Sequence, residues 1–176
     1  MGILFAFAPF FVYVVAERLW GVKPGLLSAA VVSAALLVRD WSRTRTVKVL
    51  ETGTLILFAG LAAYAFLAGT TWSIVGVRLR VDAGLLLIVL VSLAVRRPFT
   101  LQYARQTVAP ELWTTPRFVR TNYVITAIWA VAFAVMVAAD LAMLKMPSLP
   151  ISVGVGATVV AIAGAAYFTQ WYPEHS

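Results

Sequence analysis

Most of this 176-residue chain consists of apolar runs whose lengths approach the thickness of a lipid bilayer. A membrane-spanning helix needs about 20 apolar residues, whereas a membrane β-strand would show alternating segments of about ten residues, and these runs do not alternate. The chain is 62% hydrophobic and 12% charged, against about 45–50% and 25% in a soluble domain. We therefore predict an all-α fold, a polytopic transmembrane bundle of five or six helices that forms a single domain over residues 1–176. The predicted segments are about 3–20, 24–38, 52–69, 81–95, 122–144 and 150–171.

Basic residues are concentrated in two connecting loops, 39–51 and 96–121. These loops hold nine of the fourteen lysines and arginines, and the positive-inside bias places such loops in the cytoplasm. The C-terminus then lies on the cytoplasmic side of the membrane as well. The first segment conflicts with this bias locally, because its basic neighbours Arg18 and Lys23 follow it. If that segment enters the membrane without crossing it, five spans remain instead of six.

The loop 96–121 is divided by prolines. Pro98 and Pro110 suit the first turn of a helix, and Pro116 is expected to break the chain before a span that begins at Asn122, a natural N-cap. Apolar and aromatic residues after Pro98 share one helical face. This pattern favours a short helix in the membrane interface, with its apolar face among acyl chains and its arginines near headgroups. An ordinary connector that stops transfer is the alternative.

The net charge of +7 indicates a negatively charged binding partner. In a soluble protein it would suggest nucleic acid, but in a chain this apolar it indicates the anionic headgroups of membrane lipids, and we expect no nucleic-acid partner. The two basic loops are the surfaces that would contact lipid or a partner protein. The candidate residues are Arg96, Arg97, Arg105, Arg117, Arg120, Arg43, Arg45 and Lys48.

Three polar residues lie at or near membrane depth, where burying an ionisable group is expensive. Tyr13 and Glu17 follow Pro9 at spacings of four, so all three share a helical face. Asp140 is the most deeply placed acid. One interpretation is an intramembrane polar site formed by Glu17, Tyr13 and Asp140. The other is that both acids lie at the interface, where Glu17 pairs with a nearby basic residue.

Small residues recur every four positions in the second and sixth segments. Such stripes allow helix backbones to approach closely in membranes. Packing within the chain and a homodimer seam both agree with the pattern. The two stripes are Gly25, Ala29 and Ser33, and Ala157, Ala161 and Ala165.

Residues for catalysis are scarce. The chain has no cysteine, and its one histidine is the penultimate residue, His175. A histidine-based triad, a metal site built from several histidines and a thiolate site therefore cannot be assembled. The sequence also has no phosphate-binding or dinucleotide-binding motif. We predict a protein that is not an enzyme, with no catalytic residue, no metal and no cofactor.

Three stretches carry a resemblance to a known family. They are the start, FAFAPFFVYVVAERLWGVKPGLLSAAVVSAALLV; the middle, WSIVGVRLRVDAGLLLIVLVSLAVRRP; and PELW followed by Arg120, Asn122, Trp129, Ala130 and Phe133. In this order they resemble the bacterial intracellular septation protein A family, also called the inner-membrane-spanning protein family. The likeness extends over most of the chain.

The resemblance implies a multi-pass inner-membrane protein of the cell envelope. Such proteins are associated with septation, envelope integrity and contacts with division or cell-wall synthesis proteins, and they have no assigned catalytic residues. Two other hypotheses come from the residues themselves. One is a small transporter or channel that uses Glu17 and Asp140, with Pro9 interrupting the first helix. The other is an accessory subunit of a larger membrane complex, which the small-residue stripes would allow.

Overall fold

The computed structural model describes residues 5–69, 71–146 and 148–175, and within these ranges it is all-α, as the sequence predicts. Seven α-helices and one short 3-10 turn are present in this part of the chain. The contacts group into two compact units, Met1–Val77 (unit 1) and Arg78–Ser176 (unit 2), and each is described by itself. The prediction of a single domain stays a prediction.

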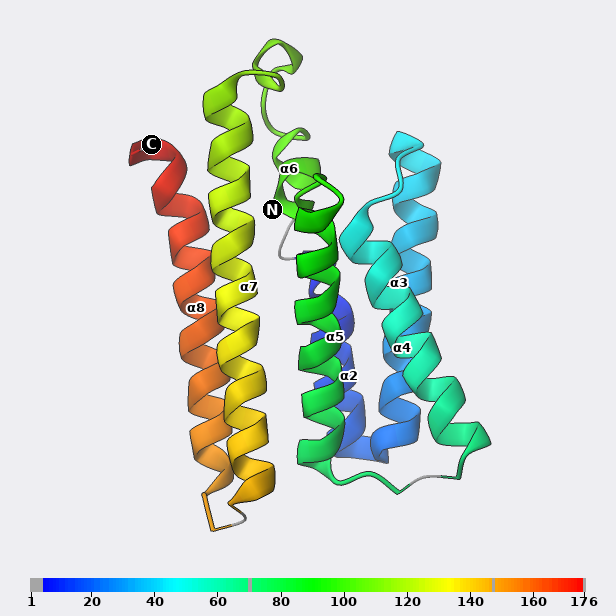
Figure 1. The fold of residues 1–176 in the computed structure, drawn as a ribbon. Helices are drawn as coiled ribbons and strands as arrows, with labels where there is room; N and C mark the ends of the chain where they lie inside the picture. Colours follow the sequence, from blue (N-terminus) through cyan, green and yellow to red (C-terminus); the bar gives the residue numbers. More distant parts are fainter. Residues whose placement is uncertain (1–4, 70, 147, 176) are drawn as a thin grey trace. The chain divides into compact units, whose positions relative to one another are not determined.

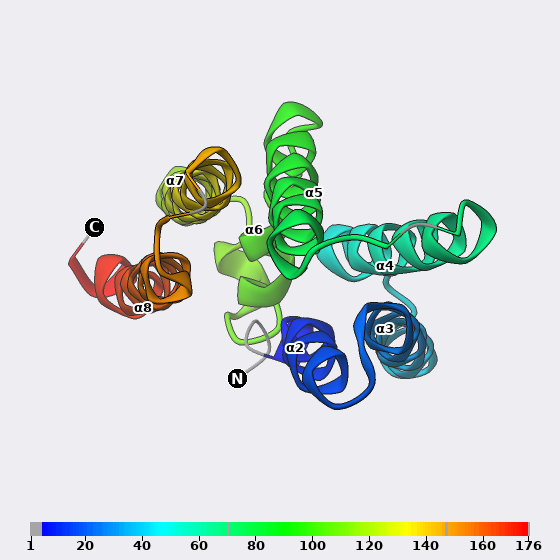
Figure 2. The same ribbon diagram turned by 90° about the horizontal axis from the view of Figure 1, so that it is seen from below.

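In unit 1, α3 packs against both α2 and α4 (Figures 1 and 2). The chain reverses from α2 into α3 through Gly21, whose φ of 90° favours glycine. Glycine is also needed at Gly25, because a Cβ there would lie 3.0 Å from the backbone nitrogen of Glu17. The helices are α2 (Ala8–Trp20), α3 (Val22–Thr44) and α4 (Val49–Leu67).

Aromatic side chains join α2 to α4 inside unit 1. The ring of the buried Phe58 lies 5.0 Å from that of Phe10 and 5.8 Å from that of Tyr13, measured between centroids. Pro9 lies in the first turn of α2, where its missing N–H leaves no intrahelical bond unmade. Helix α2 begins at Ala8, and a turn at Phe7 separates it from the helical residues Phe5 and Ala6. That Pro9 interrupts the first helix stays a prediction.

Unit 2 is built on two long antiparallel helices, α7 and α8, which lie side by side in Figures 1 and 2. Trp129 of α7 is buried and its indole N–H donates a 3.0 Å hydrogen bond to the Thr169 hydroxyl of α8. This bond links α7 to α8. The unit contains nearly all of α5 (Ile74–Ala94), with α6 (Phe99–Ala104), the 3-10 turn η1 (Pro110–Leu112), α7 (Pro116–Lys145) and α8 (Ile151–His175).

The short helix predicted after Pro98 is present as α6, but its apolar face packs on protein. Phe99 is fully buried, and its ring meets that of Trp129 edge to face at 6.4 Å. The Thr100 hydroxyl donates to the Asn122 carbonyl at 2.9 Å and lies 2.7 Å from the Thr126 hydroxyl. Burial against α7 satisfies these polar groups in a way that acyl chains cannot. The expectation that this face enters lipid is therefore wrong.

The start of the fifth predicted segment also differs from expectation. Pro116 occupies the first turn of α7, and Thr115 caps the helix by accepting a 3.4 Å bond from the Phe118 amide. Asn122 is therefore not an N-cap. It lies inside the helix, where its side-chain amide donates to the Phe118 carbonyl at 2.9 Å. The proline begins the helix because its fixed φ is preorganised for that position.

Four helices in the described residues are long and apolar enough to cross a membrane: α3, α4, α7 and α8. Many of their large apolar side chains are exposed, including Ile56 and Val160 at 68% and 73%, as lipid-facing surfaces require. The 30 residues of α7 give a length of about 45 Å, which exceeds the roughly 30 Å hydrocarbon core. The chain thus has the features of a multi-pass membrane protein.

The other two predicted segments fall short of these criteria. The 13 residues of α2 extend over only about 20 Å, and residues 3 and 4 of the first predicted segment lie outside the described ranges. Helix α5 has 21 residues but carries charged side chains in its first half. The choice between five and six spans stays a prediction.

Candidate functional site

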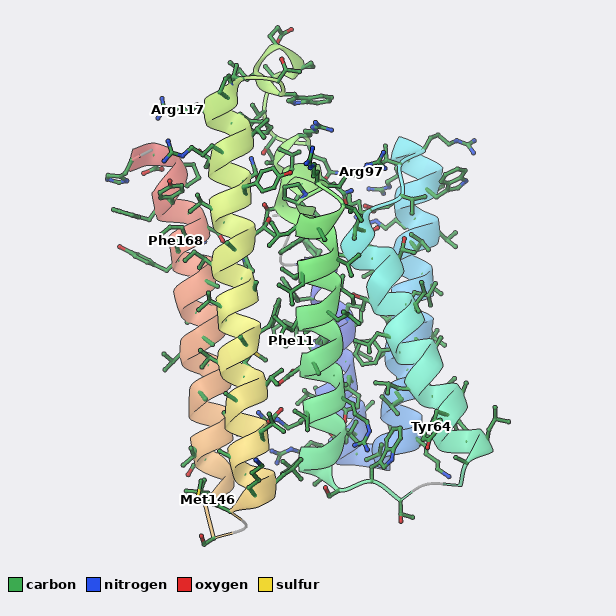
Figure 3. All side chains as sticks on the ribbon, in the orientation of Figure 1. Phe11, Tyr64, Arg97, Arg117, Met146 and Phe168 are labelled. Atoms are coloured by element: carbon green, nitrogen blue, oxygen red, sulfur yellow. The ribbon has the colours of Figure 1, made fainter. Side chains whose placement is uncertain are left out.

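Five exposed arginines gather at the end of unit 2 where α5 finishes and α7 begins. Figure 3 shows Arg97 and Arg117 at this end, whereas Met146 lies at the opposite end. The acids on the described residues of this end are Glu111 and Glu174, so the end has a net positive charge. We call these five residues the arginine surface: Arg96, Arg97, Arg105, Arg117 and Arg120.

Arg96 is held in the left-handed backbone region, with φ of 56°. Its N–H bonds to the Leu93 carbonyl at 3.0 Å, and the N–H of Arg97 bonds to the Ser92 carbonyl at 2.9 Å. This pair of bonds is the Schellman motif, in which glycine normally holds the position of Arg96. Pro98 follows directly and prevents the helix from continuing. The basic-basic-proline sequence thus ends α5 and presents two charges to solvent.

Aromatic side chains accompany the arginine surface. The Arg105 guanidinium lies 5.5 Å from the ring centre of Trp113, a cation–π distance. The Trp113 indole N–H donates to the Val108 carbonyl at 2.9 Å and so holds this ring. Near the end of α8, the rings of Phe168 and Tyr172 stack at 4.8 Å. Amphipathic aromatic rings beside arginines are typical of the interface between water and a bilayer.

Unit 1 carries a smaller basic group at the end of α3. Arg43 and Arg45 are exposed. Arg45 also has a left-handed backbone, with φ of 53°, and its N–H bonds to the Trp41 carbonyl at 3.0 Å. Its guanidinium lies 6.0 Å from the Trp41 ring centre.

Lys48 is not part of this basic surface, contrary to the sequence prediction. Only 5% of the residue is exposed. Its ammonium group forms ion pairs with Asp40 of α3 and, at 3.1 Å, with Glu51 of α4. The lysine therefore joins the two helices, and it compensates the charges of the buried Glu51 and of the partly exposed Asp40. Sequence reasoning missed this cluster, although the spacing of three between Lys48 and Glu51 is a helical pairing signal.

The polar residues predicted at membrane depth fall in both units. Tyr13 is 2% exposed and Glu17 is half-buried, and both belong to α2 of unit 1. Asp140 is fully buried in α7 of unit 2. That the three residues face one cavity stays a prediction.

Asp140 forms an ion pair that reaches across unit 2. The guanidinium of Arg78 on α5 lies 3.5 Å from its carboxylate. The same guanidinium donates to the Thr158 hydroxyl at 2.9 Å and to the Gly154 carbonyl at 3.3 Å, both on α8. Asp82, one turn after Arg78 and also buried, interacts electrostatically with Arg78 and with Asp140. The spacing of four between Arg78 and Asp82 places them one helical turn apart, but the sequence contains no sign of the link to Asp140.

The small residues at helical spacing divide between packing and open surface. Gly25, Ala29 and Ser33 are buried in unit 1, and the close approach of Gly25 to Glu17 is a contact between α2 and α3. This agrees with packing inside the chain. On α8, Ala165 is buried, whereas Ala157 and Ala161 are half-buried. The homodimer stays a prediction.

These features support binding more directly than catalysis. Among the described residues, no group of three or more histidines, cysteines or acids is placed to hold a metal ion. Comparison of the chain with known protein families, with curated proteins and with solved structures gives no match. The exposed arginine surface and the buried Arg78–Asp82–Asp140 cluster are therefore the two candidate sites.

Proposed function

We propose that this is a non-enzymatic, multi-pass protein of the bacterial inner membrane that acts through contacts with anionic lipids and partner proteins. Its role would be septation or envelope maintenance, as the resemblance of the three quoted stretches to the septation protein A family implies. The partners of that role would be division or cell-wall synthesis proteins. In this proposal the arginine surface and the C-terminus lie in the cytoplasm.

The observation that carries the proposal is the exposed arginine surface beside aromatic rings. Five guanidinium groups project at one end of unit 2, and the adjoining aromatic side chains suit the headgroup region. Arginine presents several donors in a planar fork that matches a phosphate group. Each basic residue near an anionic surface contributes about 1 kcal/mol, so several must act together. The surface therefore supports recognition of phosphate headgroups with a net negative charge.

A second candidate function is a small transporter or channel that uses Glu17, Tyr13 and Asp140. The complete burial of Asp140 favours it, because an ionisable group within a membrane helix is by default a functional hypothesis. An accessory subunit of a larger complex is the third candidate, and the exposed apolar side chains of α8 would provide its contact face. Neither candidate explains why the arginines gather at one end of unit 2.

The lipid contact is tested by exchanging three arginines for glutamine. The protein is purified in mild detergent, and native mass spectrometry measures the dissociation constants of single phosphatidylglycerol and phosphatidylcholine molecules. We expect R96Q/R97Q/R105Q to weaken binding of the anionic lipid by up to about 100-fold, at roughly 1 kcal/mol per residue. Binding of the zwitterionic lipid should change little.

A matched triple variant supplies the control. R18Q/R80Q/K145Q removes the same charge from exposed residues outside the arginine surface, so it should leave most of the phosphatidylglycerol affinity intact. Equal losses in the two triple variants would show that only net charge matters. Unchanged affinity in R96Q/R97Q/R105Q would refute the proposed contact.

A further inference from the structure

The lipid contact leaves one feature of unit 2 unexplained, an ion pair at which three helices meet. The Arg78 guanidinium of α5 lies 3.5 Å from the carboxylate of Asp140 on α7, which has no exposed surface. The same guanidinium donates to the Thr158 hydroxyl at 2.9 Å and to the Gly154 carbonyl at 3.3 Å, both on α8. The charged half of α5, the end of α7 and the start of α8 lie at the same end of the unit (Figure 1). The ion pair therefore joins all three helices there.

The uncharged part of α5 is too short to cross a membrane by itself. Residues 83–94 of the helix contain no charged side chain, and they extend over about 18 Å. The hydrocarbon core of a bilayer is about 30 Å thick. The complete helix of 21 residues extends over about 32 Å, which matches that thickness. If α5 crosses the membrane, it must take its first half, with Arg78, Arg80 and Asp82, into the bilayer.

A charged side chain within a membrane helix is expensive unless a partner compensates it. Helix α5 carries two arginines but only one acid, Asp82, so it cannot balance both arginines from its own residues. Asp140 on α7 provides a second carboxylate, and it pairs with Arg78. The hydrogen bonds from Arg78 are accepted on α8. Both partner helices are apolar enough to cross a membrane, so they can carry these polar groups to the depth at which α5 needs them.

We propose that α5 crosses the membrane as a span that depends on the α7–α8 hairpin, and that Arg78 enters the bilayer as an ion pair with Asp140. The hairpin then provides polar partners that lipid cannot provide. The pair also determines the side of the membrane on which α5 ends. Because Arg96 and Arg97 follow the helix directly, it keeps the arginine surface on the side opposite to Thr71, which precedes the helix. This role of the pair does not depend on the lipid contact.

Cysteine accessibility before and after α5 tests the crossing. Thr71→Cys and Gln106→Cys replace exposed residues of a chain that has no cysteine. Each is introduced alone into the full-length protein and treated with a membrane-impermeant maleimide in spheroplasts. We expect Thr71→Cys to react in intact spheroplasts and Gln106→Cys to react only after permeabilisation, as the positive-inside bias predicts. Equal labelling of the two sites before permeabilisation would show that α5 does not cross, and it would overturn the proposal.

Substitutions in the ion pair test its part in the insertion of α5. In the Gln106→Cys protein, Asp140→Asn leaves Arg78 without its carboxylate. Part of the molecules should then fail to insert α5, so that Gln106→Cys takes the accessibility of Thr71→Cys and its labelling in intact spheroplasts rises at least about fivefold. Arg78→Met should not raise the labelling, because α5 then carries one arginine and one acid, and α7 is apolar enough to cross with Asp140.

The double variant Arg78→Met/Asp140→Asn should restore the protection of Gln106→Cys. Replacing both partners of a buried ion pair removes the cost of an unpaired charge, whereas replacing one partner creates it. Glu174→Gln is the control, because it removes an exposed acid of α8 and should leave the labelling unchanged.

Two results from these variants would refute the proposal. Unchanged labelling in Asp140→Asn would show that α5 inserts without the pair. Equal labelling in Asp140→Asn and in the double variant would show that the loss of Asp140 acts by a route other than the charge of Arg78. If Asp140→Asn does not accumulate in the membrane, immunoblotting of the double variant decides the question. Recovery of the protein with Gln106→Cys protected supports the pair, and continued absence of the protein contradicts it.

Discussion

Arg45 and Arg96 each occupy the position after a helix that glycine most often takes. Both have φ near +55°, at 53° and 56°, and this left-handed conformation costs a residue with a Cβ about 1–2 kcal/mol. Both are exposed and basic. A backbone conformation that lowers the stability of the fold is expected where the side chain of that residue serves another purpose. In the function proposed above, contact with headgroup phosphates is such a purpose.

At this scale, Arg96→Gly should raise stability while it weakens lipid binding. Relief of the left-handed conformation is offset in part by the greater freedom of glycine in the unfolded chain, so we expect a gain of up to about 1 kcal/mol. Arg97→Gly removes the same charge from a neighbour whose φ is not positive, and it should bring no gain. Thermal unfolding in detergent measures both variants. Equal shifts in the two unfolding midpoints would contradict the prediction.

At the scale of helices, the close contact between α2 and α3 depends on the missing side chain of Gly25. A Cβ at this position would lie 3.0–3.1 Å from three atoms of Glu17, two of which are backbone atoms. Backbone cannot move aside as the end of a flexible side chain can. The turn at Gly21 lies between these two residues and brings α3 back against α2.

Gly25→Ala should therefore destabilise unit 1. Overpacking of this kind costs about 1–3 kcal/mol, and we expect a lower midpoint of thermal unfolding. Gly60 of α4 is the matched control in the same unit, because a Cβ there meets nothing within 4 Å. Gly60→Ala should stabilise its helix by about 0.5–1 kcal/mol. If both alanines stabilise the protein, the contact between α2 and α3 is looser than described.

The existence of the helices follows from the apolar runs, but their ends do not. The span predicted from residue 122 rests only on apolar composition. Helix α7 begins earlier, at Pro116, because proline and the Thr115 cap favour a helix start there. Likewise α3 continues to Thr44 through charged residues. The docking of Thr100 on α7 was also beyond prediction, since its partners lie more than twenty residues away.

The candidate sites also contain one part that the sequence predicts and one part that it does not. The exposed arginines could be predicted, because a basic residue near a helix end rarely has a reason to be buried. Lys48 is the exception, and its burial depends on Asp40, which a neighbouring helix brings to it. The pairing of Arg78 with Asp140 likewise depends on which faces of α5 and α7 meet. Apolar periodicity along one segment contains no information about such pairs.

At the scale of the membrane protein, the α7–α8 hairpin determines which parts of unit 2 share a side. The two helices run in opposite directions (Figure 1), so the end of α8 lies at the same end of the unit as the arginine surface. The connection between α7 and α8, which includes Ser148, lies at the opposite end. Since both helices can span a bilayer, Gln106 and Glu174 should be separated from Ser148 by the membrane.

Cysteine labelling can test this arrangement cleanly, because the natural chain has no cysteine. Single variants Gln106→Cys, Ser148→Cys and Glu174→Cys are treated with a membrane-impermeant maleimide in intact and in permeabilised spheroplasts. The positive-inside bias predicts that Ser148→Cys is labelled in intact spheroplasts. The other two should react only after permeabilisation, and the unmodified protein should not react at all. Labelling of all three in intact spheroplasts would show that the hairpin does not cross, and a reversed pattern would place the arginine surface outside the cytoplasm.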